Sequence, residues 1–401
     1  MGVASVDCVG ALPTWRGVPH DPTEWFSADE LDRSRRYQRP LARLRAFRLA
    51  LGLAAMAVIV GFQAAPEVVD GLGISNWVLQ LVVVVVLLEG VALLYNPALD
   101  WWVDLVHDKR WGLSTQTPRG FVVDQVKSLL LGIVVNLVLV VPLYALIRGT
   151  DLWWLWGWLL LVAFSVGLGF LYPVVIAPIF NTFTPLEDEA LRARIDDIAE
   201  RAGVSIEGAF VADESRRSTR DNAYVAGLGR TRRVVLFDTI LEHPVEVVAQ
   251  VVAHEVGHWR LHHLRRQIPL AAVLAMLLML GLRLLSEWDG LWSWAGVEGI
   301  GDPASLPVLL VAVQVGFGVM GLGMSLVSRA FERQADVQAL ELLGEPDRMQ
   351  EMLRRLHVKN LADLDPSRWR RWKASHPPAA ERMALVRAWV ERERAGSGRH
   401  S

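Results

Sequence analysis

Six long apolar stretches constrain this chain more than any other feature of its sequence. Each approaches the length that a helix needs to cross a bilayer, roughly 20 residues. Apolar residues make up 52% of the chain and charged residues only 21%, which excludes a disordered protein. Because the apolar residues are clustered, an ordinary soluble enzyme is also disfavoured. The stretches are residues 47–62, 77–95, 129–147, 152–173, 268–285 and 306–327.

The alternative to membrane spans is a set of core helices in a soluble protein. Residues 81–88 are almost entirely valine and leucine, so this segment has no polar face that could lie against water. Length and lack of charge favour membrane spans for the whole group. The sequence therefore predicts a mainly α-helical, multi-pass membrane bundle with six spans.

The distribution of lysine and arginine predicts the orientation of these spans. Basic residues precede the first span at Arg43, Arg45 and Arg48, and they recur after the last span. By contrast, residues 64–76 and 286–305 contain acids but no lysine or arginine. Basic loops stay on the cytoplasmic side, so we expect both termini there. The arginine- and valine-rich composition is typical of a bacterial protein, which suggests the bacterial plasma membrane.

The polar segments suggest the domain organisation. We expect a cytoplasmic N-terminal segment at 1–46, a membrane domain with four spans at 47–180, and a second domain at 181–401. That second domain is interrupted by the spans at 268–285 and 306–327. Within it, residues 186–202 have the apolar spacing of an amphipathic helix, and 222–225 and 233–237 have the pattern of two strands. A further helix is expected from Pro244 to about His263.

Charge and cysteine content limit the partners. The formal net charge is -2, so a basic excess suited to nucleic acid is missing and we expect no nucleic-acid partner. The single cysteine, Cys8, excludes an internal disulfide and a zinc site built on thiolates. Any metal ion must therefore be bound by histidine, aspartate or glutamate.

The expected helix from Pro244 contains the motif H-E-V-G-H. His254 and His258 are four residues apart, so both imidazoles project from one helix face and can bind one metal ion. Glu255 lies beside the first histidine, where it can reach a water molecule on the metal. Zinc lowers the pKa of such water to about 7, and a glutamate can then accept its proton during attack on a carbonyl. The alternative is a pair of surface histidines beside an exposed acid.

The residues around the motif favour the metal site. The flanking positions are uncharged, which predicts a buried helix face, and buried polar side chains without partners are costly. Zinc needs a third protein ligand. His262 lies too far along a straight helix to share the ion, and no glycine turn precedes it. We therefore interpret His262 and His263 as a helix end that faces lipid head groups or water.

An acidic pair after the last span offers a better third ligand. Glu332 and Asp336 lie one helical turn apart in F-E-R-Q-A-D. One carboxylate can bind the metal while the other accepts the N–H of a ligand histidine. On its own, the pair is more typical of solvated acids that pair with Arg329 and Arg333.

At this point the sequence resembles a known family, the CAAX prenyl protease (type 1) family of integral-membrane zinc metallopeptidases, which are related to HtpX-type proteases. Several motifs in one order carry the resemblance over most of the chain. They are F-S-A-D-E-L-D-R-S-R-R-Y at Phe26, W-G-L-S-T-Q-T at Trp111, D-Q-V-K at Asp124, A-P-I-F-N-T-F-T-P-L at Ala177, N-A-Y at Asn222, R-R-V-V-L-F-D-T at Arg232, H-E-V-G-H at His254, F-E-R-Q-A-D at Phe331 and S-H-P-P-A-A-E-R at Ser375.

The resemblance implies particular roles for residues of this chain. His254, His258 and Glu332 are expected to bind one Zn²⁺ per chain, with Glu255 as the catalytic base. The domain at 181–401 is then a gluzincin-type metallopeptidase unit that contains a small β-sheet. Eukaryotic members of the family are described with seven spans around an intramembrane chamber, one more than the six predicted here.

Four further residues receive roles from the same resemblance. Asp336 is expected to support a zinc ligand, most simply His254. Asn222 and Ala223 are expected on an edge strand, whose unpaired backbone groups can bind an extended peptide of any sequence. His376 is expected to stabilise the developing oxyanion or the substrate, as a second catalytic residue, and Arg382 belongs to its motif as a substrate-binding residue.

We therefore expect a membrane-embedded zinc endopeptidase. Its substrates would be hydrophobic, membrane-associated or prenylated (CAAX-type) peptides or proteins, and membrane lipid would surround it. An HtpX-type protease of membrane-protein quality control is the main alternative. Two weaker ones are a transporter with a regulatory zinc site, which leaves Glu255 unexplained, and a zinc-binding scaffold without turnover, which has no need of that base.

Overall fold

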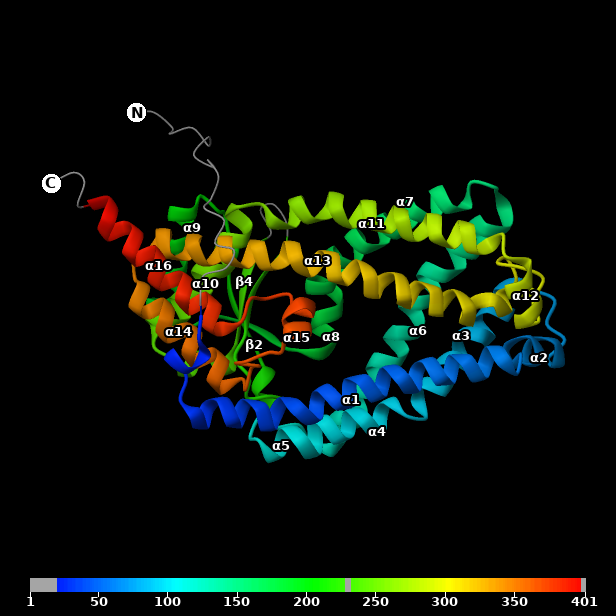
Figure 1. Ribbon diagram of the computed structural model, residues 1–401, viewed down its shortest axis with the longest axis horizontal. Coiled ribbons are helices and arrows are strands. Elements are labelled where there is room, and N and C mark those ends of the chain that lie inside the picture. The colour runs from blue at the N-terminus through cyan, green and yellow to red at the C-terminus, as the bar shows by residue number, and fades with distance from the viewer. Residues whose placement is uncertain (1–19, 228–231, 398–401) are drawn as a thin grey trace.

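The computed structural model describes residues 20–227 and 232–397, and its long helices dominate the view in Figure 1. The prediction of a mainly α-helical chain is confirmed, and so is the number of membrane spans in the described residues. Cys8, residues 1–19 of the expected N-terminal segment and residues 398–401 lie outside the described residues. The helical segments long and apolar enough to cross a membrane are Ala28–Gly61, Trp77–Arg110, Pro118–Gly149, Trp153–Phe180, His263–Ser286 and Pro303–Leu343.

The first helix, α1 (Ala28–Gly61), is longer than the apolar stretch that predicts it. It begins at a capping box, in which the Ser27 side chain accepts from the Glu30 backbone N–H and the Glu30 carboxylate accepts from that of Ser27. The polar first half of α1 contributes Leu31 to the core of the metallopeptidase unit. Part of the expected cytoplasmic segment at 1–46 is therefore continuous with the first span.

The remaining elements of the N-terminal half are mostly helical. Figure 1 shows that the long helices run side by side along the longest axis of the molecule. Their apolar side chains pack into a second core and leave many others exposed, as expected for lipid-facing surfaces. The elements are α2 (Ala64–Gly71), α3 (Trp77–Leu93), α4 (Asn96–Trp101), α5 (Asp108–Arg110), α6 (Pro118–Gly149), α7 (Trp153–Leu171) and α8 (Ala177–Phe180).

A small mixed sheet lies in the metallopeptidase unit. Its strands are β1 (Phe183–Pro185), β2 (Gly208–Ala212), β3 (Ala223–Ala226) and β4 (Arg233–Phe237), in the order β1-β2-β4-β3. The two inner strands are parallel, and each edge strand is antiparallel to its neighbour. The last two strands were predicted, whereas the first two were not. The prediction that Ala223 lies on an edge strand agrees with this order.

Helices from both polar segments pack on this sheet and on one another. These are α9 (Glu189–Ala202), α10 (Val245–Arg260), α14 (Pro346–Lys359), α16 (Ala379–Ser397) and the C-terminal part of α13 (Leu306–Leu343). Their shared core includes Ile195, Val252, Leu340 and Leu385, which are almost fully buried. The segments before and after the last two spans therefore form one unit, although about 70 residues of other structure separate α10 from the C-terminal part of α13.

The connection between α10 and α11 (His263–Ser286) decides the shape of the site. We expected one helix to continue to about His263, but α10 ends at Arg260. His262 adopts a left-handed conformation (φ 57°), and α11 begins directly after it. This turn brings His263 back towards α10. Two further helices are α12 (Asp289–Ala295) and α15 (Arg368–Lys373). Figure 1 shows α12 at the end of the long helices that is farthest from the sheet.

Candidate metal centre

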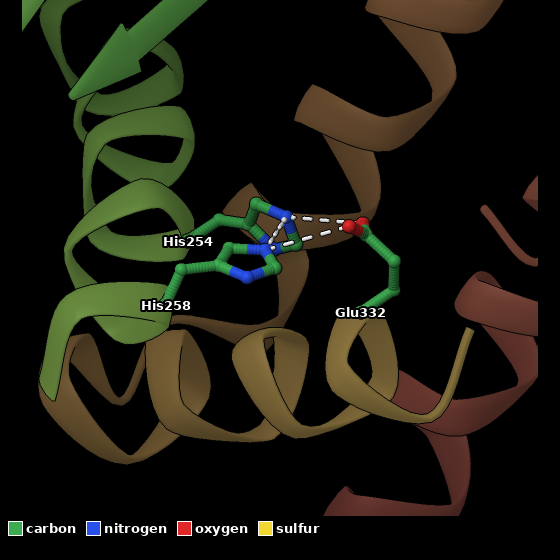
Figure 2. A group of neighbouring side chains, drawn as sticks. All are labelled: His254, His258 and Glu332. Carbon is green, nitrogen blue, oxygen red and sulfur yellow. Dashed lines mark hydrogen bonds and ion pairs between the residues drawn. The ribbon is translucent and has the colours of Figure 1, made fainter. Parts of the chain in front are cut away.

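Two histidines project from the same face of α10. The rings of His254 and His258 come from consecutive turns, and their Nε2 atoms lie 3.3 Å apart (Figure 2). Helical spacing explains this proximity, because residues four apart are neighbours on one face. His254 is buried, whereas His258 is partly exposed.

Glu332 on α13 lies opposite the two rings, as Figure 2 shows. Its Oε2 is 3.3 Å from His254 Nε2, and its Oε1 is 3.5 Å from His258 Nε2. The close approach of α13 to α10 depends on Gly257. A Cβ atom there would lie only 3.3 Å from the carbonyl oxygen of Ala335, so a larger residue would push the two helices apart.

The three side chains fit a small tetrahedral ion. Zinc ligands about 2.0–2.1 Å from the ion in tetrahedral geometry lie about 3.3 Å from one another. Here the two Nε2 atoms are 3.3 Å apart, Glu332 Oε2 is 3.3 Å from that of His254, and Glu332 Oε1 is 3.5 Å from that of His258. One ligand atom from each of the three residues lies within 4.8 Å of the other two. In addition, Glu332 Oε2 is buried without a hydrogen-bond partner. A buried carboxylate oxygen in that state needs a cation, and a metal ion would provide one.

Behind the first histidine lies a buried chain of charged groups. His254 Nδ1 is 2.9 Å from Asp336 Oδ1. The same carboxylate accepts from Arg382 Nε at 2.8 Å and from Arg382 Nη2 at 2.5 Å, so the arginine binds it in a bidentate manner. Burial opposes a charge on His254, but the nearby carboxylates of Asp336 and Glu332 outweigh it and raise its pKa to about 9. Arg382 thus lies behind Asp336, with its side chain almost fully buried.

The prediction for His263 is wrong. This side chain is buried instead of facing head groups or water, and its Nδ1 lies 2.9 Å from His258 Nδ1. Its Nε2 lies 3.0 Å from Gln334 Oε1, which can only accept. His263 therefore donates from Nε2 and accepts at Nδ1 from His258. That tautomer leaves the lone pair of His258 Nε2 directed at the candidate metal position.

No helical spacing in the sequence could reveal this contact, because the contact depends on the turn at His262. The exposed side chain of His262 itself agrees with our interpretation. The ring of His263 also stacks on Phe331, with 4.2 Å between the ring centroids. A buried histidine with both nitrogens bonded and one ring face packed holds its neighbour in a fixed orientation.

Glu255 lies beside the cluster without taking part in it. No described residue forms a hydrogen bond or ion pair with its carboxylate. Burial raises its pKa, and the nearby charge of His254 partly counteracts that effect. A partly buried carboxylate with a raised pKa and no fixed partner is suited to proton transfer.

His376 approaches the cluster from the loop between α15 and α16. Its Nε2 is 3.5 Å from Glu332 Oε2, and its Nδ1 is 2.9 Å from the Ser375 hydroxyl. The side chain remains 59% exposed, so one side of the ring is free for contact with another molecule. The structure therefore brings together seven of the nine site residues predicted from the sequence.

Asn222 and Ala223 lie apart from these contacts. Ala223 begins β3, and the backbone carbonyl of Asn222 accepts from Phe237 N–H at 3.0 Å. The opposite edge of β3 is not paired with any described strand. Asn222 and Tyr224 line a cavity of about 760 Å³.

Comparisons with known proteins identify the relatives of this chain. The family model "Peptidase family M48" matches residues 185–390, and "CAAX prenyl protease N-terminal, five membrane helices" matches residues 13–182. The chain belongs to the CAAX prenyl protease family of M48 peptidases. It is therefore a metalloprotease and an integral membrane protein. The N-terminal family model has five membrane helices, whereas residues 20–182 contain four candidate spans.

Full-length relatives support the same assignment. The chain is 28% identical over 398 residues to a CAAX prenyl protease 1 homolog from Oryza sativa subsp. japonica, which covers 94% of this chain and 90% of the relative. It is 28% identical to CAAX prenyl protease 1 from Saccharomyces cerevisiae, over 89% of this chain and 87% of the relative. An uncharacterized metalloprotease from Bacillus subtilis, YhfN, is 32% identical over 76% of this chain and 72% of the relative.

A solved structure confirms the fold. The crystal structure of S. mikatae Ste24p superposes on this chain with a TM-score of 0.82. The two sequences are 25% identical, and the alignment covers 92% of each chain. The M48 family implies a metal cofactor, and the cluster of His254, His258 and Glu332 fits one.

Proposed function

We propose that this protein is a zinc-dependent endopeptidase with its active centre at His254, His258 and Glu332. The observation that carries the proposal is the meeting of two imidazole nitrogens 3.3 Å apart with the Glu332 carboxylate, whose two oxygens lie 3.3 and 3.5 Å from them. Beside them lies a partly buried glutamate, Glu255, that has no fixed partner among the described residues. A transporter with a regulatory metal site would have no use for that glutamate. The unpaired strand edge of β3 likewise favours a peptidase.

Two imidazoles and one carboxylate are the ligands typical of a catalytic zinc site with an open fourth position. When bound, Zn²⁺ supplies Lewis-acid polarisation of the substrate carbonyl and makes water a stronger nucleophile. The chain's own residues prepare the ligands. Asp336 holds Nδ1 of His254, and His263 holds Nδ1 of His258, so that both Nε2 lone pairs converge on one point.

Glu255 is the proposed general base and acid. It accepts the proton of the attacking water and then passes it to the amine that leaves. Because its pKa is raised, the Glu255 carboxylate is a stronger base than that of an exposed glutamate, which favours removal of the proton from water. His376 is the proposed donor to the carbonyl oxygen as negative charge develops there, and its partly exposed ring allows that contact.

Arg382 is proposed as a positioning residue in addition to the substrate-binding role expected from its motif. Its buried, bidentate contact with Asp336 fixes the carboxylate that orients His254. For Asn222 and Ala223, we propose that an extended substrate peptide adds to the free edge of β3 beside them. Backbone hydrogen bonds there bind any sequence, which leaves selection to the surrounding cavities.

For the substrates, we propose hydrophobic, membrane-associated or prenylated peptides and proteins. The printed names of the relatives refer to CAAX prenyl proteases, and Glu332 of the active centre lies on α13, a helix that continues into the membrane. Quantitative proteomics of membranes with the active enzyme or the Glu255→Gln variant would identify the substrates. Accumulation of prenylated proteins supports the proposal, whereas accumulation of misfolded membrane proteins alone favours an HtpX-type role.

We further propose a bacterial plasma membrane with both termini and the active centre in the cytoplasm. The basic residues at the ends of the spans support this orientation. Reporter fusions after Asp302 and at the C-terminus test it, because the last span separates these two points. Reporters active on the same side would contradict the orientation and the number of spans.

The test of the mechanism is the substitution Glu255→Gln. It should lower the rate of peptide cleavage by about 10²–10⁴-fold, the usual contribution of a general acid–base. Glu246→Gln, at an exposed position on the same helix, is the matched control and should leave the rate unchanged. Both variants should retain one zinc ion per chain. Unaltered cleavage by Glu255→Gln would overturn the assignment of the base.

A further inference from the structure

The short helix α15 has a composition unlike the rest of the surface. Its six residues are R-W-R-R-W-K, and Trp369 and Trp372 are each more than half exposed. Their rings stack with 6.4 Å between the centroids, and Lys373 Nζ lies 4.5 Å from the Trp369 ring centroid. Exposed tryptophans next to basic residues are typical of a membrane–water interface.

Hydrogen bonds hold α15 at the point where α13 enters the membrane. Arg329 Nη1 donates to the carbonyl oxygens of Arg371, Trp372 and Ala374, at 3.2, 3.0 and 2.7 Å. The Ser325 hydroxyl donates to the carbonyl oxygen of Lys373 at 3.1 Å. Because the apolar stretch of α13 ends at residue 327, α15 lies at the level of the lipid head groups.

A cavity of about 690 Å³ lies between α15 and α1. From α1, Arg45 lines it just before the apolar part of that helix begins at residue 47. From α15, Trp369, Arg370 and Lys373 line it. Figure 1 shows α15 between α1 and α13 in projection, and the lining residues confirm that it borders α1.

The cavity carries more positive charge than its own acids neutralise. Arg370 pairs with Asp363 at 2.6 Å, whereas Arg45 and Lys373 form no ion pair with any described residue. Beside them, the exposed apolar residues Ala46 and Leu49 on α1 line the same cavity. Unpaired cations next to exposed apolar side chains match a ligand with an anionic head and apolar tails.

We propose that this cavity binds the phosphate-bearing head group of an anionic phospholipid. Arg45 and Lys373 contact the phosphate, Trp369 packs beside the head group, and the acyl chains run along Ala46 and Leu49. A soluble anion would gain nothing from those apolar side chains, which is why a lipid is favoured. His376 also lines this cavity, so the cavity borders the proposed active centre. The lipid contacts proposed here use none of the side chains of the peptidase mechanism, so either proposal can fail without the other.

Native mass spectrometry of the purified full-length protein tests the proposal. Detergent micelles containing either phosphatidylglycerol or phosphatidylcholine would be compared at equal lipid concentration. The wild type should retain phosphatidylglycerol in preference. Arg45→Gln/Lys373→Gln should weaken retention about fivefold for each lost cation, the effect typical of one basic side chain near an anionic membrane surface.

A charge-matched control removes two exposed arginines elsewhere, Arg192→Gln/Arg392→Gln, and should retain the lipid as the wild type does. Monodisperse elution and unchanged zinc content show that each variant is folded; the single variants replace the double one if it aggregates. Equal binding of both lipids, or equal loss in both double variants, would overturn the proposal. Displacement of the lipid by excess inorganic phosphate would instead identify a free-anion site and also overturn it.

Discussion

The two ends of α13 lie in different environments, and their side chains differ accordingly. In the N-terminal part, the apolar side chains Val315, Phe317 and Val319 are 50–67% exposed. In the C-terminal part, the acidic side chains of Glu332 and Asp336 are at most 7% exposed. This is the reverse of a water-soluble helix, where acids face outward and apolar residues face inward.

The contrast has a physical cause. Lipid surrounds the first part of α13, so apolar side chains there need no cover from protein. The second part lies inside the metallopeptidase unit, where a buried acid survives only with a cation or a hydrogen-bond donor beside it. Asp336 has Arg382 and His254, whereas Glu332 Oε2 has no hydrogen-bond partner among the described residues. Glu332 Oε2 is therefore the oxygen that a metal ion would bind.

The largest expected effect is at Glu332. Glu332→Gln should remove most of the metal and lower cleavage by about 10³-fold or more, because a Lewis acid supplies several kcal/mol of charge stabilisation. Glu341→Gln on the exposed face of the same helix is the control. Elemental analysis and a peptide-cleavage assay measure both effects. If both variants lost metal and cleavage activity to the same extent, the buried face of α13 would not differ from its exposed face in binding the metal.

Next is the buried pair behind the site. Asp336→Asn leaves the charge of Arg382 without a partner, so we expect the free energy of unfolding to fall by about 3–5 kcal/mol. Thermal or denaturant unfolding of the metallopeptidase unit in detergent would measure the loss. Replacing both partners, with Asp336→Asn and Arg382→Met, should recover part of it. A destabilised single variant that gains nothing from the second substitution would speak against the pair.

The lipid-facing part of α13 is tested by a charge. Val319→Arg should disfavour insertion by about 2.5–3.5 kcal/mol, the effect of an arginine at the centre of a span. Ala190→Arg, at an exposed position on α9, should be tolerated because water surrounds it. The yield of membrane-integrated protein provides the measurement. If both variants insert equally well, the exposed valines of α13 do not face lipid.

The smallest effect is expected at His263. His263→Leu removes the acceptor for His258 Nδ1, so the affinity for zinc should fall about 10–100-fold, as for other residues that orient a metal ligand. His262→Leu changes the adjacent, exposed histidine and should leave the affinity intact. Competition with a chelator measures both affinities. A larger loss in His262→Leu would mean that we have assigned the wrong histidine.

The sequence predicted the parts of the site that local periodicity controls. His254 and His258 follow from their spacing on one helix, and the spans follow from length and hydropathy. Glu332 needed the resemblance to a family, because nothing local distinguishes it from a solvated acid. The role of His263 was missed because the left-handed turn at His262 reverses the chain, and no helical spacing encodes that turn.

The sheet shows the same limit. β3 and β4 were predicted from their apolar runs, and they pair with each other. The strand β1 is only three residues long and ends with Pro185, and β2 pairs in parallel with β4 across more than 20 residues of chain. Short strands that gain their stability from distant partners leave little pattern of their own.

Anomalous diffraction at the zinc edge, on crystals of active wild-type protein, tests the central claim most directly. We expect one strong peak within about 2.0–2.2 Å of His254 Nε2, His258 Nε2 and a Glu332 carboxylate oxygen. The peak should disappear in crystals of Glu332→Gln. A peak bound by other side chains, or its absence from protein that cleaves peptides, would contradict the account.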